Sequence, residues 1–362
     1  MPDMAIAGRI ASLRARLSDA GCDGILITKL ENIRYLTGFS GSTAMCFVND
    51  AGTVFVSDGR YGDQATAQLS AAGVDATITI GGLKDQLQAI SFGAREATRI
   101  GLEAQACSWS QKIQFEEVFA TAELVATTGV VEGLRVIKDD GELARIEHAC
   151  AIADFAFAQV KSRLTEGITE AQFAAELEFE MRKRGSAGPS FETIVASGPN
   201  GAMPHARPTE RLIEKGELIV IDFGAIFDGY HSDMTRTVSV GEPNTELADL
   251  MDAVLSAQRA GLHAVEPDTT ADEVDAACRE VLADRGLGER FVHSTGHGVG
   301  LEVHEAPLVA AGSTDILRPG TVATVEPGAY ISGRGGARIE DTVVVTDNGA
   351  RILTKTTKDY IL

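Results

Sequence analysis

Cysteine and tryptophan are scarce in this sequence, with five cysteines and one tryptophan among 362 residues. The cysteines are scattered and form no C-x-x-C pair, which argues against a disulfide framework and a thiolate zinc site and fits a reducing compartment. The early residues lack the basic-then-apolar pattern of a signal peptide, and no apolar run is long enough to span a bilayer. We therefore expect a cytoplasmic protein without a membrane partner.

Positive charge is also in short supply. The chain has 32 lysines and arginines against 52 acidic residues, which gives a formal net charge of -20. A surface this negative repels nucleic-acid phosphates and anionic lipid heads, so we expect no nucleic-acid partner. Most of the excess is explained by solubility alone, but acidic groups also collect cations, and a few of these acids stand in unusual places.

Several catalytic and nucleotide-binding motifs are missing. The sequence has no Walker A loop, no G-x-S-x-G and no H-E-x-x-H. The N-terminal half has no G-x-G-x-x-G after a strand, so dinucleotide binding has no support there. Asp222-Phe-Gly imitates the D-F-G of protein kinases, but neither a catalytic-loop H-R-D nor a glycine-rich loop precedes it. The chemistry must come from another arrangement of residues.

The length of 362 residues exceeds what one hydrophobic core usually organises, so two domains are expected. Residues 1–132 alternate helix-like and strand-like segments, which predicts an α/β layer with a mixed or parallel sheet. Ile6, Ile10, Leu13 and Leu17 fall at helical spacing and predict an amphipathic first helix. The other expected elements are strands at 24–27, 53–56, 76–80 and 124–127 and helices at 60–69 and 83–92.

Residues 133–140 are expected to form a linker, and residues 141–362 the second domain. Asp140 is expected to cap a helix that runs to about Leu164, with Glu142 suited to the positive end of the helix dipole. The pattern beyond predicts an α+β arrangement in which helices pack against one face of a largely antiparallel sheet. Its further helices are expected at 170–184, 245–264 and 271–285, and its β-rich stretches at 192–197, 218–226, 232–240, 321–331 and 337–346.

Three of the seven histidines fall close together in this second part. His293, His297 and His304 share the run H-S-T-G-H-G-V-G-L-E-V-H. The glycines between them let the backbone approach a ligand closely or adopt a positive φ. A single histidine on an apolar face is more often a core residue, but a glycine-flanked cluster indicates a site.

Four acidic residues stand within apolar, β-forming segments. They are Asp222 in V-I-D-F-G, Asp233 in S-D-M-T-R-T, Glu326 in V-A-T-V-E-P-G and Glu340 in R-I-E-D-T. Burying one polar group without a partner costs roughly 2–7 kcal/mol, and an ionised group costs more. Any one of these acids is readily explained as exposed or ion-paired, whereas four of them beside a histidine cluster require a common explanation.

A pair of divalent metal ions supplies that explanation. Four carboxylates carry a charge of about −4, which two divalent cations would balance and a single Arg or Lys would not. With the imidazole of His297 they form a hard, oxygen-rich ligand set that favours Mn(II), Co(II), Fe(II) or Zn(II). Two such ions ~3.5–4 Å apart hold a bridging hydroxide as nucleophile. The residues therefore predict a soluble hydrolase whose metal ligands are Asp222, Asp233, His297, Glu326 and Glu340.

In this order and these settings, the residues resemble the creatinase/aminopeptidase P/prolidase family of "pita-bread" metallopeptidases. The settings are I-D-F-G-A, S-D-M-T-R-T, G-H-G-V-G-L-E-V-H-E, V-E-P-G-A-Y and R-I-E-D-T, and the segments N-I-R-Y-L-T-G-F-S-G and S-D-G-R-Y are similar to the family's N-terminal domain. The resemblance covers nearly the whole chain. It implies an α+β fold with a C-terminal pita-bread domain preceded by a smaller α/β creatinase-like domain. The intact ligand positions differ from creatinase proper, which works without metal.

The resemblance also implies how the metal ligands divide their work. Asp222 and Asp233 would chelate one metal ion, and His297 and Glu326 would bind the second. Asp233 and Glu340 would bridge the two ions, which we expect to be manganese, with cobalt or zinc as alternatives. Glu326 would in addition take the proton from the nucleophilic water.

Roles for residues around the metals are implied in the same way. His205 and His304 would orient the scissile carbonyl and stabilise the oxyanion as it forms. His293 would line the substrate pocket, and Arg338 would hold a carboxylate beside the metals. His231 shares the strand face of Asp233 and is expected to be structural.

The implied activity is hydrolysis of the Xaa-Pro bond in short peptides with a free N-terminus. Proline has no N–H and a fixed φ, so a dedicated enzyme makes sense. Aminopeptidase P and prolidase, which takes only Xaa-Pro dipeptides, share one catalytic set, and the segment S-D-G-R-Y favours the aminopeptidase. A non-catalytic peptide-binding module is the alternative from another class. Family members often dimerise, so the resemblance implies a homodimer.

Overall fold

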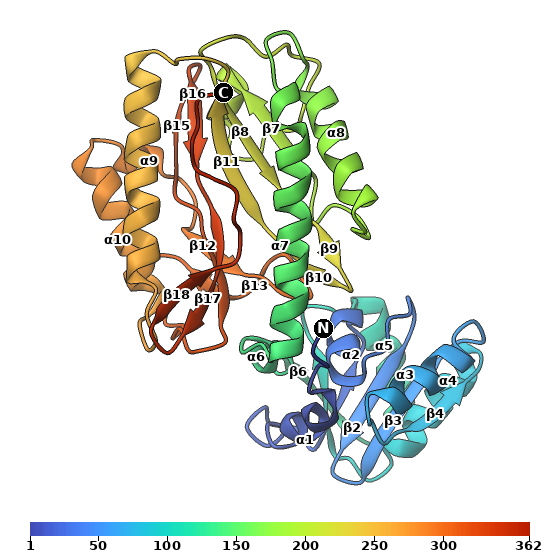
Figure 1. Ribbon diagram of the computed structural model, residues 1–362. Coiled ribbons are helices and arrows are strands. Elements are labelled where there is room, and N and C mark those ends of the chain that lie inside the picture. The colour runs from blue at the N-terminus through green and yellow to red at the C-terminus, as the bar shows by residue number, and fades with distance from the viewer. The chain divides into compact units, whose positions relative to one another are not determined.

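The computed structural model describes residues 1–362 and divides them into two compact units (Figure 1). The N-terminal unit is Met4–Arg135, and the C-terminal unit is Val136–Leu362 together with Met1–Asp3. None of the helices in either unit has the length and apolar character that crossing a membrane requires. Each unit has its own sheet and its own helices, and the two are described separately.

The N-terminal unit is built on one six-stranded mixed sheet of order β4-β3-β2-β1-β5-β6. β1, β2 and β3 pair antiparallel, while β3–β4, β1–β5 and β5–β6 pair parallel. The predicted α/β layer with a mixed sheet is confirmed. The strands are β1 (Gly24–Ile27), β2 (Met45–Asn49), β3 (Gly52–Ser57), β4 (Thr77–Ile80), β5 (Arg99–Glu103) and β6 (Glu123–Thr127).

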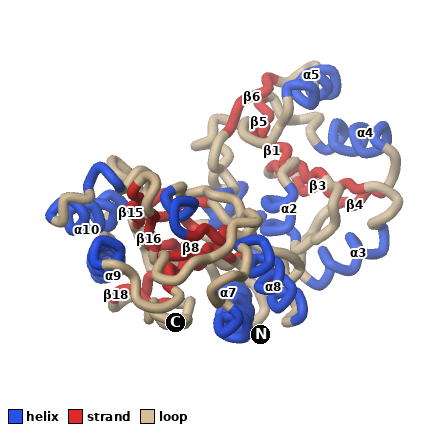
Figure 2. Tube along the Cα trace, turned by 90° about the horizontal axis from the view of Figure 1, so that it is seen from above, coloured by secondary structure: helices blue, strands red, loops and turns tan.

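Short helices surround this sheet in Figure 2. The predicted amphipathic first helix is only one and a half turns of α-helix preceded by a 3-10 turn at Ile6–Gly8, yet its four apolar residues are all buried. Several elements here, among them β2, β5 and two helices, were not predicted from the sequence. The helices are α1 (Arg9–Arg14), α2 (Leu30–Thr37), α3 (Gly62–Ala71), α4 (Leu83–Gly93), α5 (Trp109–Val118) and α6 (Glu132–Arg135).

Four long helices dominate the C-terminal unit, and their limits lie within a few residues of the predicted ones. The first begins one residue earlier than expected, because Asp139 and not Asp140 is the cap. Asp139 accepts a hydrogen bond from the Glu142 backbone N–H at 2.9 Å, and the Glu142 carboxylate accepts one from the Asp139 N–H at 3.1 Å. The helices are α7 (Asp140–Val160), α8 (Glu170–Lys183), α9 (Thr245–Ala264) and α10 (Ala271–Asp284).

The strands of this unit all pair antiparallel, as predicted. A three-stranded sheet has the order β11-β8-β7, a five-stranded sheet has the order β13-β12-β14-β17-β18, and β9–β10 and β15–β16 are hairpins. The strands are β7 (Ile194–Ser197), β8 (Leu218–Phe223), β9 (Ile226–Phe227), β10 (Tyr230–His231), β11 (Met234–Ser239), β12 (Gly296–Gly298), β13 (Glu305–Val309), β14 (Val322–Val325), β15 (Gly328–Ile331), β16 (Gly335–Arg338), β17 (Asp341–Thr346) and β18 (Gly349–Ile352).

Two predicted long strands are each broken at a key acid. The stretch 321–331 divides at Glu326-Pro327, where proline has no N–H to give to a ladder. The stretch 337–346 divides at Ile339-Glu340. Both carboxylates therefore leave from strand ends, where the chain changes sheets, and not from the middle of a ladder.

Each helix pair covers its own sheet. α7 and α8 pack on the three-stranded sheet through Phe157, Phe173 and Ile221, and α9 and α10 pack on the five-stranded sheet through residues such as Val254 and Val325. Figure 1 shows α9 and α10 on one side of the strands and α7 and α8 on the other. Polar side chains can therefore lie on the strand faces that are turned away from these helices.

Candidate metal centre

Alternation of successive side chains turns two of the predicted acids, Asp222 and Glu340, away from the helices. In β8, Ile221 and Phe223 belong to the α7–α8 core, so Asp222 between them points the other way. Ala337 and Ile339 belong to the α9–α10 core, which turns Glu340 away from it in the same manner. A period of two residues thus builds both the cores and the polar site between the sheets.

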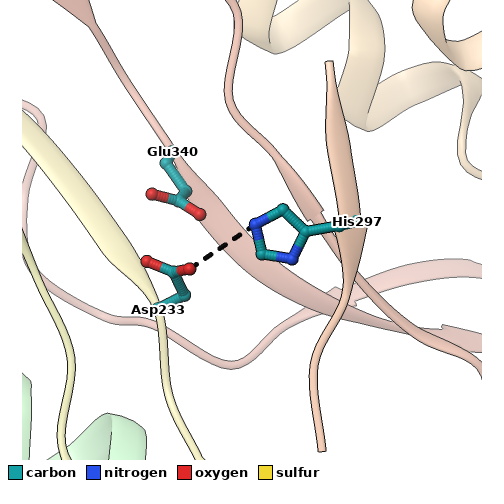
Figure 3. Close-up of side chains that lie close together, drawn as sticks. All are labelled: Asp233, His297 and Glu340. Atoms are coloured by element: carbon teal, nitrogen blue, oxygen red, sulfur yellow. Dashed lines mark ion pairs between the residues drawn. The ribbon is translucent and has the colours of Figure 1, made fainter. Parts of the chain in front are cut away.

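Asp233, His297 and Glu340 meet at the centre of this site. One potential ligand atom from each lies within 4.8 Å of the others. Figure 3 shows the three side chains pointing toward one another from three separate strands or strand ends. The His297 Nε2 atom lies 3.6 Å from Asp233 Oδ2. This is the arrangement of acidic and imidazole ligands that a divalent cation requires.

Glu326 and Asp222 complete the group on either side. Glu326 Oε1 lies 3.2 Å from His297 Nε2, and Asp222 Oδ2 accepts a hydrogen bond from Arg338 at 2.6 Å. Asp222, Asp233, His297 and Glu326 all line one cavity of about 850 Å³. The structure therefore brings all five predicted ligands together, four of them on the cavity wall and Glu340 directly behind.

Two carboxylate oxygens in this group have no hydrogen-bond partner. Asp222 Oδ1 and Glu340 Oε1 are buried and unpaired, although their second oxygens are bound by Arg338 and, at 2.8 Å, by the Thr235 hydroxyl. Buried acceptors without donors are rare and costly in proteins. An orphaned oxygen on each of two neighbouring acids fits residues that are kept for a cation.

The electrostatics of the site point the same way. Burial, followed by the charges of neighbouring carboxylates, raises the pKa of Asp233 and of Glu340 well above their usual values. The pKa of Asp222 is also raised by burial, against the opposing effect of Arg338. Burial acts in the same sense on Glu326, but the pKa of that group is lowered by its hydrogen bond and charge contact with His297. Bound cations would remove the mutual repulsion among these acids.

Backbone contacts fix the orientation of the His297 ring. Its Nδ1 lies 3.1 Å from the Gly298 carbonyl oxygen, which can only accept, so Nδ1 carries the proton. In the neutral imidazole the lone pair is therefore on Nε2, which faces the acids, as a metal ligand requires. Gly298 itself has no room for a side chain, because a Cβ there would stand 2.1 Å from the Ala306 carbonyl oxygen.

Arg338 is fully committed to holding the site and is only 3% exposed. Besides Asp222, its guanidinium donates to the Thr235 hydroxyl at 3.1 Å, to the Pro204 carbonyl at 3.2 Å and to the Tyr330 hydroxyl at 2.8 Å. With all these donors engaged, the side chain is placed to orient Asp222. Arg338 also lines the cavity.

The histidines that were predicted around the metals divide into two kinds. His205, His293 and His304 line the cavity, whereas His231 is absent from its wall and shares a hydrogen bond with Ser190 Oγ at 2.8 Å. The His304 ring packs edge-on against His297, with ring centroids 4.3 Å apart. Burial, followed by the charge of His297, lowers the pKa of His304. Both effects favour the neutral form of His304.

Tyr330 is a site residue that the sequence reasoning missed. Its hydroxyl accepts from Arg338 and lies 2.9 Å from His293 Nε2. Because the His293 Nδ1 donates to the Ser294 carbonyl at 2.7 Å, the Tyr330 hydroxyl donates to Nε2. Both nitrogens of His293 are thus occupied. The sequence offered one indication of this role, because Tyr330 stands four residues after Glu326 in the motif V-E-P-G-A-Y.

A buried ion pair stands behind the loop that carries His304. Lys138 Nζ lies 2.8 Å from Glu305 Oε1, and both side chains are nearly inaccessible to solvent. Lys138 belongs to the stretch that was expected to be a linker, and its backbone N–H also donates to the Gly320 carbonyl at 3.0 Å. The pair joins the first residues of the C-terminal unit to the wall of the cavity.

Comparison with known proteins decides the family. A model of metallopeptidase family M24 matches residues 144–347, and a model of the Creatinase/Prolidase N-terminal domain matches residues 9–137. The chain belongs to metallopeptidase family M24. The M24 family uses divalent metals, so this chain is a metallopeptidase, and the predicted family and fold class are confirmed.

Relatives of this M24 metallopeptidase match it over almost its whole length. It is 36% identical to the Xaa-Pro dipeptidase of Pyrococcus furiosus, over 98% of this chain and 99% of that one. The solved Xaa-Pro dipeptidase from Bacillus anthracis superposes with a TM-score of 0.93 at 40% identity, over 98% and 99% of the two chains. The solved X-Pro aminopeptidase from Thermotoga maritima gives a TM-score of 0.86 at 34% identity, over 98% and 99%.

Proposed function

We propose that this M24 metallopeptidase is an Xaa-Pro dipeptidase that works with two divalent metal ions. The observation that carries the proposal is the buried group of four carboxylates and one imidazole with two orphaned oxygens, set in the wall of a cavity. The names of the relatives in Pyrococcus furiosus and Bacillus anthracis support the substrate class. The sequence motifs favoured the aminopeptidase, and these relatives move the dipeptidase ahead of it.

In this proposal the four acids and the one imidazole would hold the metals. Asp222 and Asp233 would hold one ion, His297 and Glu326 would hold the other, and Asp233 and Glu340 would be shared between them. We keep manganese as the expected metal, with cobalt and zinc as alternatives, because the set is rich in hard oxygen ligands. When bound, such a metal pair lowers the pKa of a water molecule and polarises a carbonyl.

The remaining groups would handle protons and charge around the substrate. Glu326 would accept the proton of the attacking water. His304 and His205 would donate to the carbonyl oxygen as it becomes an oxyanion. His293 would form part of the pocket wall through its ring face and edges, because Tyr330 and Ser294 occupy both of its nitrogens. Arg338 would fix Asp222.

Other features of the proposal rest on the family resemblance or on composition. We retain residues 141–362 as the catalytic domain, residues 1–132 as the creatinase-like domain and residues 133–140 as the connection between them. A homodimer and a cytoplasmic location also remain proposals. They are tested by the molar mass in solution and by fractionation of the source cells.

The decisive experiment compares two substrates on metal-reconstituted protein. Ala-Pro and Ala-Pro-Ala are incubated side by side with protein loaded with Mn(II), Co(II) or Zn(II), and products are separated by HPLC, with Asp233→Ala as the control. Cleavage of only the dipeptide supports the proposal. Cleavage of the tripeptide at its Ala-Pro bond would make the enzyme an aminopeptidase. The similarity to the X-Pro aminopeptidase from Thermotoga maritima is the reason for testing this alternative. If metal-loaded protein cuts neither, the Xaa-Pro assignment is wrong.

A non-catalytic peptide-binding module is the competing function. It predicts that purified protein binds no stoichiometric metal. Elemental analysis after dialysis separates the two, since the proposal expects about two divalent ions per chain, the number for a two-metal hydrolytic site.

A further inference from the structure

Glu170 is a buried acid that lies outside the cavity and that neither the motifs nor the metal site explain. It is the first residue of α8, and its side chain is completely inaccessible to solvent. No lysine or arginine forms a salt bridge with it. Instead, the carboxylate accepts hydrogen bonds from three residues of one loop. A fully buried carboxylate that is satisfied only by hydrogen bonds has been fitted to those particular donors.

The donors come from the two ends of a single loop, residues 197–209. At its start, Ser197 donates through its backbone N–H at 2.7 Å and its hydroxyl at 2.8 Å. At its end, Thr209 donates through its backbone N–H at 3.1 Å and its hydroxyl at 2.6 Å. Asn200 Nδ2 lies 3.0 Å from Oε2 and 3.2 Å from Oε1. One carboxylate therefore closes the base of the loop.

The tip of that loop reaches the catalytic cavity. Pro204 and His205 both line the cavity, and the Pro204 carbonyl accepts from Arg338, the residue that holds Asp222. The start of α8 adds backbone support, because the N–H of Ala171 donates to the Thr209 carbonyl at 3.0 Å. The position of His205 is thus set by a loop whose two ends are fastened at one point.

We propose that Glu170 is a positioning residue that acts through His205. By clamping both ends of the loop, it holds the imidazole of His205 where the scissile carbonyl is polarised. The proposal rests on the proposed function, which gives His205 that role. It also explains the need for a carboxylate. Each carboxylate oxygen accepts a hydrogen bond from a backbone N–H, which can only donate. A glutamine would replace one of these oxygens with an NH₂ group, which is itself a donor and cannot accept from the backbone.

The test is a double-mutant cycle between Glu170→Gln and His205→Ala, with kcat and KM measured on Ala-Pro. Glu170→Gln should lower kcat by about 10–100-fold, the range for losing a group that orients an active-site residue. In the His205→Ala background, the same change should lower kcat less than about threefold, because residues that act together are not additive. Bound metal should stay at the parental level, since the ligands come from other segments.

Glu103→Gln is the matched control. Glu103 is also buried and accepts from the backbone N–H groups of Thr28 at 2.6 Å and Lys29 at 2.8 Å and from Asn32 Nδ2 at 2.7 Å. It belongs to the N-terminal unit, and no residue of that unit lines the cavity. Glu103→Gln should destabilise the protein as Glu170→Gln does, while kcat stays within about twofold of the parent on the additive behaviour of remote sites.

Either of two kinetic results would overturn the proposal. One is a parental kcat in Glu170→Gln, and the other is an equal loss in both backgrounds, which is the mark of a purely structural role. If Glu170→Gln does not fold, Thr209→Val removes one donor and should give a smaller loss of the same non-additive kind. The NMR signal of the His205 ring, followed without substrate, should move in Glu170→Gln and not in Glu103→Gln. Failure of the parent to cleave Ala-Pro would count against the proposed function, whereas an unmoved ring signal counts against Glu170.

Discussion

Glu340 and Asp341 are adjacent acids with nearly the same exposure, 1% each, in opposite environments. Glu340 faces the candidate metal site, where one of its oxygens has no partner and its pKa is raised well above the usual value by burial and neighbouring acids. Asp341 faces away. Its pKa is lowered because Arg236 and Lys358 outweigh the effect of burial. One peptide bond separates a buried carboxylate with an unpaired oxygen from one whose two oxygens are both paired.

The partners of Asp341 show what a satisfied buried acid looks like. Its Oδ1 accepts from Arg236 and Thr354, both at 2.8 Å. Its Oδ2 accepts from Gln258 at 2.9 Å and lies 2.5 Å from Lys358 Nζ. The comparison teaches that burial alone does not mark a functional acid. What marks it is burial with oxygens left over.

The largest effect is expected for catalysis at Glu340. Glu340→Gln keeps the size of the side chain and removes the charge that we propose bridges the metals, so kcat/KM for Ala-Pro should fall at least about 1000-fold, or about 4 kcal/mol at 1.36 kcal/mol for each tenfold. Steady-state kinetics at saturating Mn(II) measure it. Activity within tenfold of the parent would show that Glu340 is not part of the metal site.

The next largest effect is on stability at Asp341. Asp341→Asn should reduce the free energy of unfolding by about 3 kcal/mol, because breaking a buried ion pair leaves the guanidinium and ammonium uncompensated. Urea denaturation of metal-free protein measures it, with the exposed Asp347→Asn as a control expected to stay within about 0.5 kcal/mol. Because the folded state lowers the pKa of Asp341 below 3.8, the loss should be complete above that pH and fade below it. If the loss of unfolding free energy did not change with pH, the contrast between Glu340 and the ion-paired Asp341 would be wrong.

A smaller effect of opposite sign is expected for the stability of metal-free Glu340→Gln. The folded state raises the pKa of Glu340 above its usual 4.5, so the charged form destabilises the fold at neutral pH. The substitution should therefore stabilise metal-free protein at pH 7 by roughly 0.5–2 kcal/mol, the range for relieving a strained functional site. The gain should shrink as the pH falls toward 4.5. Destabilisation at pH 7 would mean that Glu340 is satisfied without metal.

The smallest effect is expected at the exposed mouth of the cavity. Glu192 and Arg207 form an ion pair at 2.9 Å, with side chains 59% and 78% exposed. Glu192→Gln should change the free energy of unfolding by less than about 1 kcal/mol, because exposed pairs contribute little. Thermal unfolding at low and high salt measures it. A larger change in the free energy of unfolding would mean that this exposed ion pair stabilises the fold as strongly as a buried one.

Much of the site could be predicted from the sequence, because its residues stand in short motifs. The acids are conspicuous in apolar strand-like segments, and His297 is marked by its glycines. The structure brings these residues into one cluster and sets His205, His293 and His304 around it. Their metal-binding and catalytic roles remain proposals until they are measured.

The parts that escaped prediction depend on contacts between distant segments. Glu170 reads as an ordinary first-turn helical acid, and only the fold shows that it clamps a loop 27 or more residues away. The breaks at Glu326 and Glu340 were missed because strand propensity continues through them. In the N-terminal unit, β2 and β5 were missed because short apolar runs such as Arg99–Glu103 carry too little periodicity to separate strand from helix.

The ion pair between Lys138 and Glu305 limits where the chain can be divided into separate domains. A chain shortened to begin at residue 141 would keep every predicted ligand, yet it would strip an ammonium partner from an acid that is sealed inside the fold next to His304. The boundary at which an evolutionary recombination or an engineered fusion could separate the two halves therefore lies upstream of Lys138. The chain from Val136 onward belongs with the C-terminal unit.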